Sequence, residues 1–466
     1  MPSPVLPHLT VLAALLPPDR FLWSDEERAS FAGDKWARGP LPDCVVRPQS
    51  TEEVAIVARF CFQNDIPLTT RGGGWGFVGG AVVSRGGVLL SLDAMNRILD
   101  ISRADFVAHV EAGVLTGDFA RAVRGVGLFY PPDPASLDYC TIGGNIATNA
   151  GGPHCLKYGV TRSYVLGLEV VLMDGTVLQL GGDTHKNKTG FDLLGLFVGS
   201  EGMLGIVTRA TLRLLPLPRA RRALAAHFAT IESAANAIGE VLRAGLLPCA
   251  LEVADAATLR YFRAAQGLSP QEAGAYLFVE VDGLPQSVGA EAQLLREILS
   301  AAGALDCHEA TTEAQVEELW QTRRSFSTAL SASGNAKLNE DIVVPRGKLV
   351  ELVAFAQLLG RKHALEIACF GHAGDGNIHV YLLLDSPLSP QEAGERARPA
   401  LDELFAQVLA WGGAITGEHG IGLAKMRWWS QAVSPEVRLA HATIKNALDP
   451  KGLLNPGKWL DENSSR

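Results

Sequence analysis

The chain has 466 residues. A chain of this length is too long to fold around a single hydrophobic core, so two or three domains are expected. Its composition, 47% hydrophobic and 20% charged with a net charge of −9, excludes nucleic acid as an expected partner, because phosphate binding requires a basic surface. The seven cysteines are scattered without any C-x-x-C spacing, which indicates neither a disulfide framework nor an iron–sulfur cluster and fits a reducing cytoplasm.

The N-terminal segment, residues 1–40, predicts a short helix. Its apolar run from Val5 to Leu16 is too short to span a membrane, and the absence of a preceding basic residue argues against a signal peptide. A first domain begins at Leu41, and a capping box at 50–53 predicts a helix through Phe62. The further elements expected in this domain are strands at 67–70, 88–92 and 107–111, a helix at 116–126, a hairpin at 165–180 and a last strand ending at Leu215.

Three glycine-rich segments lie between these elements: Arg71–Gly80, Cys140–Gly152 and Val198–Ile206. Six of the ten residues in the first segment are glycine. Consecutive glycines leave their backbone N–H groups accessible, and such a nest binds the oxygens of a phosphate or pyrophosphate. The pattern is neither the Rossmann nor the P-loop fingerprint. The sequence therefore predicts a dinucleotide cradle of another kind.

A domain boundary is expected at Leu215–Pro218, where prolines precede a basic run. The second domain alternates helical and extended stretches, and helices covering one face of an antiparallel sheet are the expected packing. The expected elements are helices at 231–243, 286–302, 313–330, 347–359 and 391–409, and strands at 250–253, 276–281, 365–370 and 378–384.

Two histidines near the end of this domain form a candidate metal site. Asp375-Gly376 predicts a two-residue hairpin loop, which would place His372 opposite His379 with Cβ atoms about 5 Å apart. Glu418, in a glycine-rich turn, offers a third ligand, and two histidines with one carboxylate suit a divalent transition metal with open positions. His419 is then a base beside the metal. The alternative, a histidine pair that binds nothing, remains open.

Six motifs, in this order along residues 41–460, resemble those of the FAD-linked 2-hydroxyacid dehydrogenases. They are R-G-G-G-x-G-x-x-G-G, D-P-A-S, T-I-G-G-N-I-A-T-N-A-G-G, G-S-E-G-x-L-G-I, G-H-A-G-D-G-N-I-H and G-E-H-G-I-G. That family includes the flavoprotein subunit of glycolate oxidase, cytochrome- or quinone-linked D-lactate dehydrogenases and D-2-hydroxyglutarate dehydrogenases.

The resemblance implies an α+β fold. A vanillyl-alcohol-oxidase/p-cresol-methylhydroxylase type FAD-binding domain would occupy residues 41–218, and a substrate and metal domain, an antiparallel sheet covered by helices, residues 219–430. A C-terminal tail, residues 431–466, would return to the FAD domain.

The same match implies which residues line FAD. Trp75 departs from the small polar residue expected in the first loop, although the glycines are intact. Some distant relatives attach flavin covalently through side chains such as His154 or Cys155, but non-covalent FAD is expected here. The residues expected at the cofactor are Arg71, Gly72, Gly73, Gly74, Gly76, Gly79, Gly80, Pro134, Thr141, Gly143, Gly144, Thr148, Asn149, Gly151, Glu201, Gly202 and Ile206.

Oxidation of a 2-hydroxy acid requires a base, an electrophile at the hydroxyl oxygen and a cation for the carboxylate. We expect a zinc, manganese or iron ion at His372, His379 and Glu418 to activate the hydroxyl group. His419 is the expected base, because imidazole groups in general have a pKa of about 6.5, which suits proton transfer near neutral pH. Arg323, on a helix that resembles the family's carboxylate-binding helix, is the expected carboxylate ligand, with Lys337 as a second cation. Hydride would pass to flavin N5.

The sequence does not select among glycolate, D-lactate and D-2-hydroxyglutarate. It carries no nicotinamide fingerprint, so the electron acceptor is expected to be oxygen, a quinone, a cytochrome, an electron-transfer flavoprotein or an iron–sulfur subunit. A cytoplasmic position is expected, and peripheral membrane association and a homodimer are both compatible with the sequence. Two alternatives are a flavoprotein subunit of a multi-subunit glycolate oxidase and a metal-dependent hydrolase that uses only the His/His/Glu site.

Overall fold

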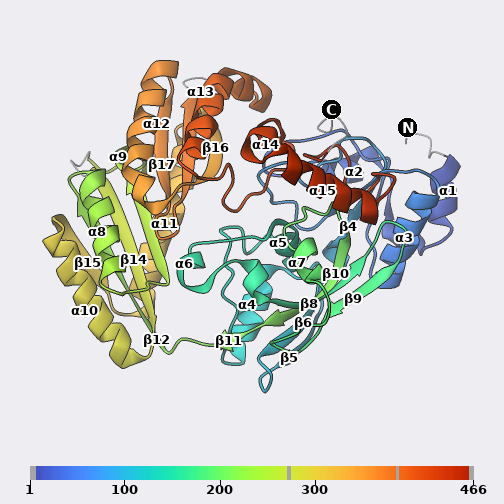
Figure 1. Ribbon diagram of the computed structural model, residues 1–466, viewed down its shortest axis with the longest axis horizontal. Coiled ribbons are helices and arrows are strands. Elements are labelled where there is room, and N and C mark those ends of the chain that lie inside the picture. Colours follow the sequence, from blue (N-terminus) through green and yellow to red (C-terminus); the bar gives the residue numbers. More distant parts are fainter. Residues whose placement is uncertain (1–6, 270–273, 385–387, 461–466) are drawn as a thin grey trace. The chain divides into compact units, whose positions relative to one another are not determined.

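A computed structural model describes residues 7–269, 274–384 and 388–460 (Figure 1). Residues 1–6 of the predicted N-terminal segment and 461–466 of the predicted tail lie outside these ranges. Backbone contacts divide the chain into two compact units. The first comprises Met1–Gly151, Val160–Leu217 and Glu418–Arg466, and the second comprises Gly152–Gly159 and Pro218–Gly417.

The first unit contains a small sheet of order β1-β2-β4-β3, whose strands are β1 (Phe21–Leu22), β2 (Cys44–Val46), β3 (Leu68–Arg71) and β4 (Val88–Ser91). Helix α3 (Thr51–Gln63) packs beside it and begins at the predicted residue, because the Ser50 side chain accepts a hydrogen bond from the Glu53 amide. The Glu53 carboxylate accepts from the Gln49 amide and not from Ser50, so only half of the predicted capping box is formed. Its buried face shares one core with strands β2 to β4, and this core includes Val54, Val57 and Leu68.

A second sheet of the first unit has the order β5-β6-β10-β8-β9 and is antiparallel throughout. Strands β8 and β9 form the predicted hairpin around Asp174-Gly175. The strands are β5 (Ile98–Ser102), β6 (Val107–Glu111), β8 (Val165–Val171), β9 (Val177–Gly181) and β10 (Ile206–Arg213), and β7 (Leu128–Phe129) pairs separately with β11 (Leu215–Pro216).

The C-terminal helices belong to this first unit. Lys445 in α15 (Pro435–Leu448) is buried, and its ammonium group donates hydrogen bonds to Asp449 and to the carbonyl oxygens of Met203 and Leu454 at 2.6 to 2.8 Å. This charged contact ties the end of the chain to the segment before β10. The other helices of the unit are α1 (Pro7–Ala13), α2 (Asp25–Phe31), α4 (Thr116–Gly125), α5 (Ile142–Thr148), α7 (Leu193–Phe197) and α14 (Met426–Ala432), with α15 at Pro435–Leu448.

The second unit is built on a seven-stranded antiparallel sheet of order β15-β12-β14-β13-β17-β18-β16. Three of these strands, β12, β15 and β16, were not predicted. The strands are β12 (Ala220–Phe228), β13 (Ala250–Asp255), β14 (Ala275–Gly283), β15 (Ala304–Ala310), β16 (Ala336–Val343), β17 (Glu366–His372) and β18 (Asn377–Leu384). The helices are α6 (Cys155–Tyr158), α8 (Ile231–Arg243), α9 (Ala256–Ala265), α10 (Pro285–Ala301), α11 (Glu313–Ala332), α12 (Leu349–His363) and α13 (Pro390–Ala410).

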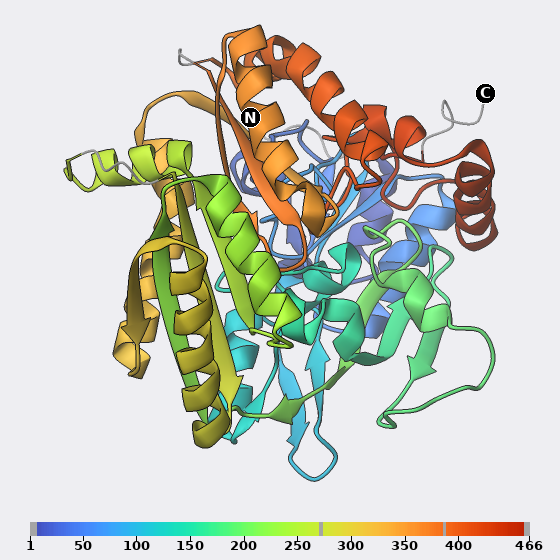
Figure 2. The ribbon, with the colours of Figure 1, turned by 60° about the vertical axis from the view of Figure 1, so that its left-hand side comes forward.

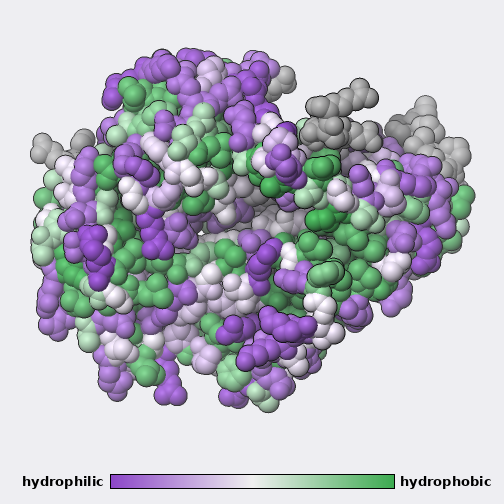
Figure 3. Space-filling model, in the orientation of Figure 1, coloured by the Kyte–Doolittle hydropathy of each residue, from purple (hydrophilic) through white to green (hydrophobic). Residues whose placement is uncertain are grey.

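Helices cover both faces of this sheet, whereas one covered face was expected. Helices α8, α10, α12 and α13 lie on one face, and α9 and α11 pack on the other (Figures 1 and 2). The reason lies in strands β13 and β18, in which every residue is buried. Both faces of these strands are therefore shielded from solvent by other elements. Over α12 and α13 the outer surface is largely hydrophilic (Figure 3).

The hairpin that carries the two histidines has a different register from the predicted one. His372 pairs with Asn377, and His379 pairs with Phe370. The loop holds four residues rather than two, because the His372 carbonyl oxygen accepts hydrogen bonds from both the Asp375 and Gly376 amides. The predicted pairing is therefore wrong by two residues. A shift of two keeps both side chains on one face, and the two imidazole centroids lie 5.5 Å apart.

None of the helices in the described ranges combines the length and the apolar character that crossing a membrane requires.

Replacing Asp255 should remove a measurable pH dependence of stability. Asp255 caps α9 from a buried position, and burial raises the pKa of its carboxyl group from 3.8 to about 6, against opposing hydrogen bonds from Thr258 and Cys369. The folded chain therefore holds this proton more tightly than the unfolded chain, and stability is lost as the pH rises. Relative to Asp255→Asn, the parent should lose about 2 kcal/mol of unfolding free energy between about pH 4.5 and about pH 7.5.

Urea unfolding of both proteins across this pH range measures the difference, and any constant effect of the altered cap cancels. A stability difference between the parent and Asp255→Asn that does not change with pH would contradict the prediction.

Candidate functional site

The first glycine-rich segment of the first unit brings bare backbone close to other backbone. A Cβ atom on Gly73 would lie 2.2 Å from the Tyr139 carbonyl oxygen, so only glycine fits there. Gly74 has a φ of +67°, which L side chains rarely adopt. A Cβ on Gly80, by contrast, would meet nothing within 4 Å. The segment is therefore tightly packed at Gly73 and has open space beside Gly80.

These residues fit the pyrophosphate part of FAD. The Thr70 hydroxyl, at the end of β3, is buried without a hydrogen-bond partner among the described residues, as expected of a group that binds a ligand oxygen. Thr141 caps α5 and Asn149 ends it in the left-handed conformation. The remaining predicted cofactor residues also lie in this unit: Arg71 in β3, Gly72, Gly76 and Gly79 in the first glycine-rich segment, Pro134 before α5, Gly143, Gly144 and Thr148 in α5, Gly151, Glu201 and Gly202 in loops, and Ile206 in β10.

Trp75, the residue that departs from the family pattern, is held between two side chains. Its ring stacks on Tyr139 with centroids 3.9 Å apart, and the Lys35 ammonium lies 3.6 Å from its ring centroid. Stacking and cation–π contacts stabilise such an arrangement. The large side chain therefore links the first glycine-rich segment to the segment that precedes α5.

Glu201 holds the loop that contains the candidate base. Its two carboxylate oxygens accept hydrogen bonds from the Ile421 and Gly422 amides at 2.8 Å each. Burial raises the pKa of this carboxyl group, and the two amide hydrogen bonds oppose the rise. His419 lies in the same loop, with its ring stacked on Phe77 at 4.9 Å. The sequence assigned Glu201 to the cofactor, and the structure shows its carboxylate bound to this loop.

In the second unit, Glu252 joins two predicted site residues. Its carboxylate lies 2.6 Å from His372 Nδ1 and accepts from Arg323 Nε and Nη2 at 2.6 and 2.5 Å. Glu252 is fully buried; burial raises its pKa, but His372 and Arg323 together lower it to about 2. The carboxylate is therefore ionised and fixes the proton of His372 on Nδ1, so Nε2 is the ring nitrogen that suits a metal.

The other predicted cations differ in their surroundings. Arg323 is buried on α11, whereas its neighbour Arg324 is half-exposed and paired with Glu317. Lys337, in β16, donates hydrogen bonds to the Ser327 carbonyl oxygen at 3.3 Å and to the Ser331 hydroxyl, and burial lowers its pKa. Of the two arginines, only Arg323 faces the sheet residues that carry the histidines.

A second buried acid, Asp341 in β16, positions the segment that leads to Glu418. One carboxylate oxygen accepts from Asn377 Nδ2 at 2.5 Å, and the other accepts from the Gly417 amide at 2.8 Å. Glu418 is the next residue in the chain. His372, His379 and Glu418 each offer one ligand atom, and these atoms lie within 4.8 Å of one another. The donor set fits a divalent transition metal, with Glu252 as the partner that orients His372.

Sequence reasoning missed both Glu252 and Asp341. Glu252 lies between Leu251 and Val253 in the fully buried strand β13, and Asp341 is a buried residue of β16 followed by Ile342. A buried charge must be paired, so an acid beside buried apolar residues is the signal that would have indicated a functional partner. The identity of that partner was not readable, because Arg323 and His372 lie far along the chain from Glu252.

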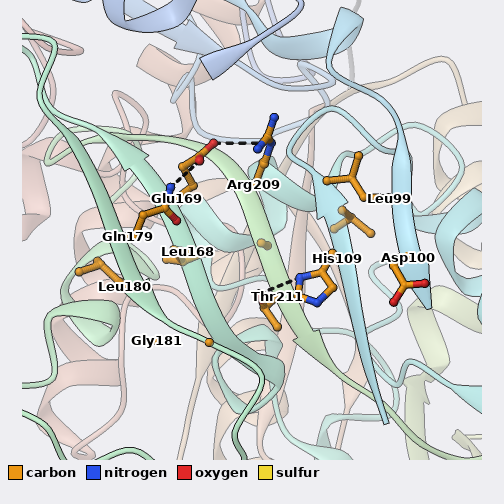
Figure 4. A pocket seen from close by; sticks show the side chains of 13 residues that line it. Leu99, Asp100, His109, Leu168, Glu169, Gln179, Leu180, Gly181, Arg209 and Thr211 are labelled. Carbon is orange, nitrogen blue, oxygen red and sulfur yellow. Dashed lines mark hydrogen bonds and ion pairs between the residues drawn. The ribbon is translucent and has the colours of Figure 1, made fainter. Parts of the chain in front are cut away.

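Figure 4 shows a surface pocket of about 460 Å³ on the five-stranded sheet of the first unit. Its lining includes His109, Glu169 and Arg209, and Glu169 accepts a hydrogen bond from Gln179 at 2.5 Å. The lining contains none of the predicted site residues. The sequence motifs therefore give no reason to place the functional site in this pocket.

Replacing Glu252 should weaken metal binding. In Glu252→Gln the negative charge that raises the basicity of His372 is lost, and Arg323 loses its counter-charge. Changes to such orienting partners typically weaken metal affinity roughly 10- to 100-fold, and we expect a loss of that size. Competition with a chromophoric chelator measures it. The matched control is Glu366→Gln in β17, an acid paired with Arg260 at the surface, and equal affinities for the two variants would contradict the prediction.

Replacing Glu201 should loosen the loop of His419. The Gln side chain in Glu201→Gln has one carbonyl oxygen, so one of the two amides loses its charged acceptor. A hydrogen bond to a charged group contributes about 1.5–3 kcal/mol, so we expect hydrogen exchange at the Ile421 and Gly422 amides to accelerate by about tenfold or more. Mass spectrometry of peptides covering 418–425 measures this. The Leu453 and Leu454 amides, which donate to Asp449, should exchange at an unchanged rate.

Comparison with known families agrees with this geometry. Residues 217–459 match a family model described as FAD linked oxidases, C-terminal domain, and residues 42–181 match a model described as FAD binding domain. Glycolate oxidase subunit GlcD of Bacillus subtilis (strain 168) is 38% identical over 428 residues, which cover 91% of this chain and 90% of that protein. A D-lactate dehydrogenase of Anaerostipes hadrus is 36% identical over 470 residues, which cover 97% of each chain.

Among solved structures, p-cresol methylhydroxylase with substrate bound has a TM-score of 0.80 at 20% identity, and the match covers 100% of this chain and 99% of that one. At this identity the likeness concerns the fold alone. It confirms the predicted type of FAD-binding domain. The match over residues 217–459 and the relatives at 36% and 38% identity show that the chain belongs to the family of FAD-linked oxidases.

Proposed function

We propose that this chain oxidises a D-2-hydroxy acid of the glycolate, D-lactate or D-2-hydroxyglutarate class to the 2-oxo acid, with non-covalent FAD and a divalent metal. The observation that carries the proposal is the buried triad of His372, Glu252 and Arg323, in which one carboxylate holds both a metal-binding imidazole and a guanidinium suited to a substrate carboxylate. Relatives named glycolate oxidase subunit and D-lactate dehydrogenase support this substrate class.

Each residue has a separate part in this proposal. Bound FAD supplies a hydride acceptor, and a bound zinc, manganese or iron ion lowers the pKa of a hydroxyl group. His372, His379 and Glu418 hold the ion. His419 accepts the hydroxyl proton, for which a neutral imidazole is suited near neutral pH.

The substrate carboxylate is held by cations of the second unit. Arg323 uses Nε and Nη2 for Glu252, and its remaining N–H groups are available for a charge-assisted hydrogen bond to the substrate. Lys337 adds a second positive charge. Because Glu252 fixes the guanidinium, the substrate carboxylate meets a pre-ordered partner and little side-chain entropy is lost on binding.

The proposed reaction also requires an acceptor for the electrons that the flavin receives. A quinone, a cytochrome, an electron-transfer flavoprotein or an iron–sulfur subunit fits a flavoprotein without a nicotinamide site. Three of the relatives are named as a subunit of glycolate oxidase. This favours a second candidate function for the chain, a flavoprotein subunit that works with partner chains.

Anaerobic mixing with 2-hydroxy acids tests the proposal. We expect one or more D-acids, or achiral glycolate, to bleach the oxidised flavin absorbance, while the matching L-acids leave it unchanged. Bleaching by an L-acid alone would overturn the assigned stereochemistry. A purified protein that binds no flavin would overturn the reaction class.

The base is tested in the same experiment with His419→Ala. The variant should retain flavin and metal but reduce its flavin at least about a hundredfold more slowly, as expected when a general base is removed. Addition of imidazole offers a chemical rescue. An unchanged reduction rate would assign the proton transfer to another group.

A further inference from the structure

A second cluster of potential metal ligands lies in the second unit, apart from the histidine pair. It consists of His154, Cys249 and Glu280, whose ligand atoms, a ring nitrogen, a thiol sulfur and a carboxylate oxygen, lie within 4.8 Å of one another. The three residues come from different segments: the stretch 152–159, the residue before β13, and β14. Their convergence therefore results from the fold and not from a local sequence motif.

Two members of the cluster are buried, His154 is half-buried, and the buried members have orienting partners. Cys249 and Glu280 are 0% and 1% exposed. The Glu280 carboxylate accepts a hydrogen bond from Trp320 Nε1 at 2.5 Å, and Arg221 Nη1 lies 3.5 Å away. The Cys249 thiol lies 3.3 Å from the Glu280 carbonyl oxygen. Such hydrogen bonds to the ligand residues are typical of built metal sites.

The segment that carries His154 is fastened to the same face of the sheet. The Lys157 ammonium donates to Asp282 Oδ1 at 2.5 Å, and the Tyr158 hydroxyl donates to Asp282 Oδ2 at 2.6 Å. The His154 ring lies against Trp320 with centroids 5.4 Å apart. Two anchors on β14 and one aromatic contact therefore fix the approach of the imidazole to Cys249 and Glu280.

The donor set selects a class of cation. Sulfur, nitrogen and oxygen ligands together suit borderline ions of the zinc class and do not suit magnesium or calcium. A divalent ion bound here would displace the proton of the Cys249 thiol, forming a metal–sulfur bond and releasing that proton to solvent.

We propose that His154, Cys249 and Glu280 bind a zinc-class divalent ion that clips residues 152–159 to the sheet of the second unit. The site is structural in this proposal, because two of its three ligands are buried and none of them is a substrate-binding residue proposed above. It differs chemically from the His372, His379 and Glu418 set, which has no sulfur. The inference does not rest on the proposed function.

Zinc analysis and X-ray absorption spectroscopy of the zinc-loaded holoenzyme test the proposal. We expect about two zinc ions per chain and a zinc–sulfur distance of about 2.3 Å in the absorption spectrum. The variants Cys249→Ala and Cys249→Ser should each lose about one of the two ions and the whole sulfur signal. The matched control is Cys61→Ala, which removes another fully buried cysteine and should keep both ions and the sulfur signal.

A further variant separates this proposal from the proposed function. His372→Ala should lose one ion yet keep the sulfur signal at the remaining one. Absence of a sulfur signal from the zinc-loaded parent protein would overturn the second site, whether or not any variant folds, and would leave flavin reduction by 2-hydroxy acids untouched. Retention of the signal in Cys249→Ser would also overturn it, because the sulfur would then come from another cysteine.

Discussion

The buried carboxylate of Glu252 constrains how a helix and two strands of the second unit pack together. Placing an ionised acid out of contact with water is costly unless charged partners surround it, and His372 and Arg323 provide these partners. The three residues belong to β13, β17 and α11, so the charge fixes how a helix and two strands meet. Removing one partner would leave the others unsatisfied, and the site and the core are therefore stabilised by the same contacts.

In the first unit the predicted cofactor site is formed mainly by backbone groups, whereas in the second unit the site is formed by charged side chains. Its glycine-rich segments present bare backbone, where the close approach of Gly73 to Tyr139 leaves no room for a side chain. Charged side chains there serve to hold loops: Glu201 binds the amides of Ile421 and Gly422, and Lys445 binds Met203 and Leu454. A backbone cradle recognises oxygens shared by many phosphates, whereas side-chain charges select a particular substrate.

Features that depend on neighbouring residues could be predicted from the sequence. Features that depend on contacts between residues far apart in the chain could not. The bounds of α8 at Ile231–Arg243 and the start of α3 follow from periodicity and capping, which are properties of neighbouring residues. The histidine pair was found despite an incorrect register, because a two-residue shift preserves the face of a strand. Strand β12 was missed because Arg221 and Arg222 interrupt its apolar pattern, and their acidic partners lie far along the chain. The same distance concealed the roles of Glu252 and Asp341.

The path of the chain has a consequence for biosynthesis. The chain enters the second unit at Gly152, leaves it at Gly159, returns at Pro218 and leaves again at Gly417. Helix α15 and the Lys445 contacts, which complete the first unit, are therefore encoded after the whole second unit. Domains on a ribosome generally fold in order of synthesis, N-terminal first. Here the N-terminal unit emerges incomplete, and it can close only after translation has passed through the second unit and reached the last helix.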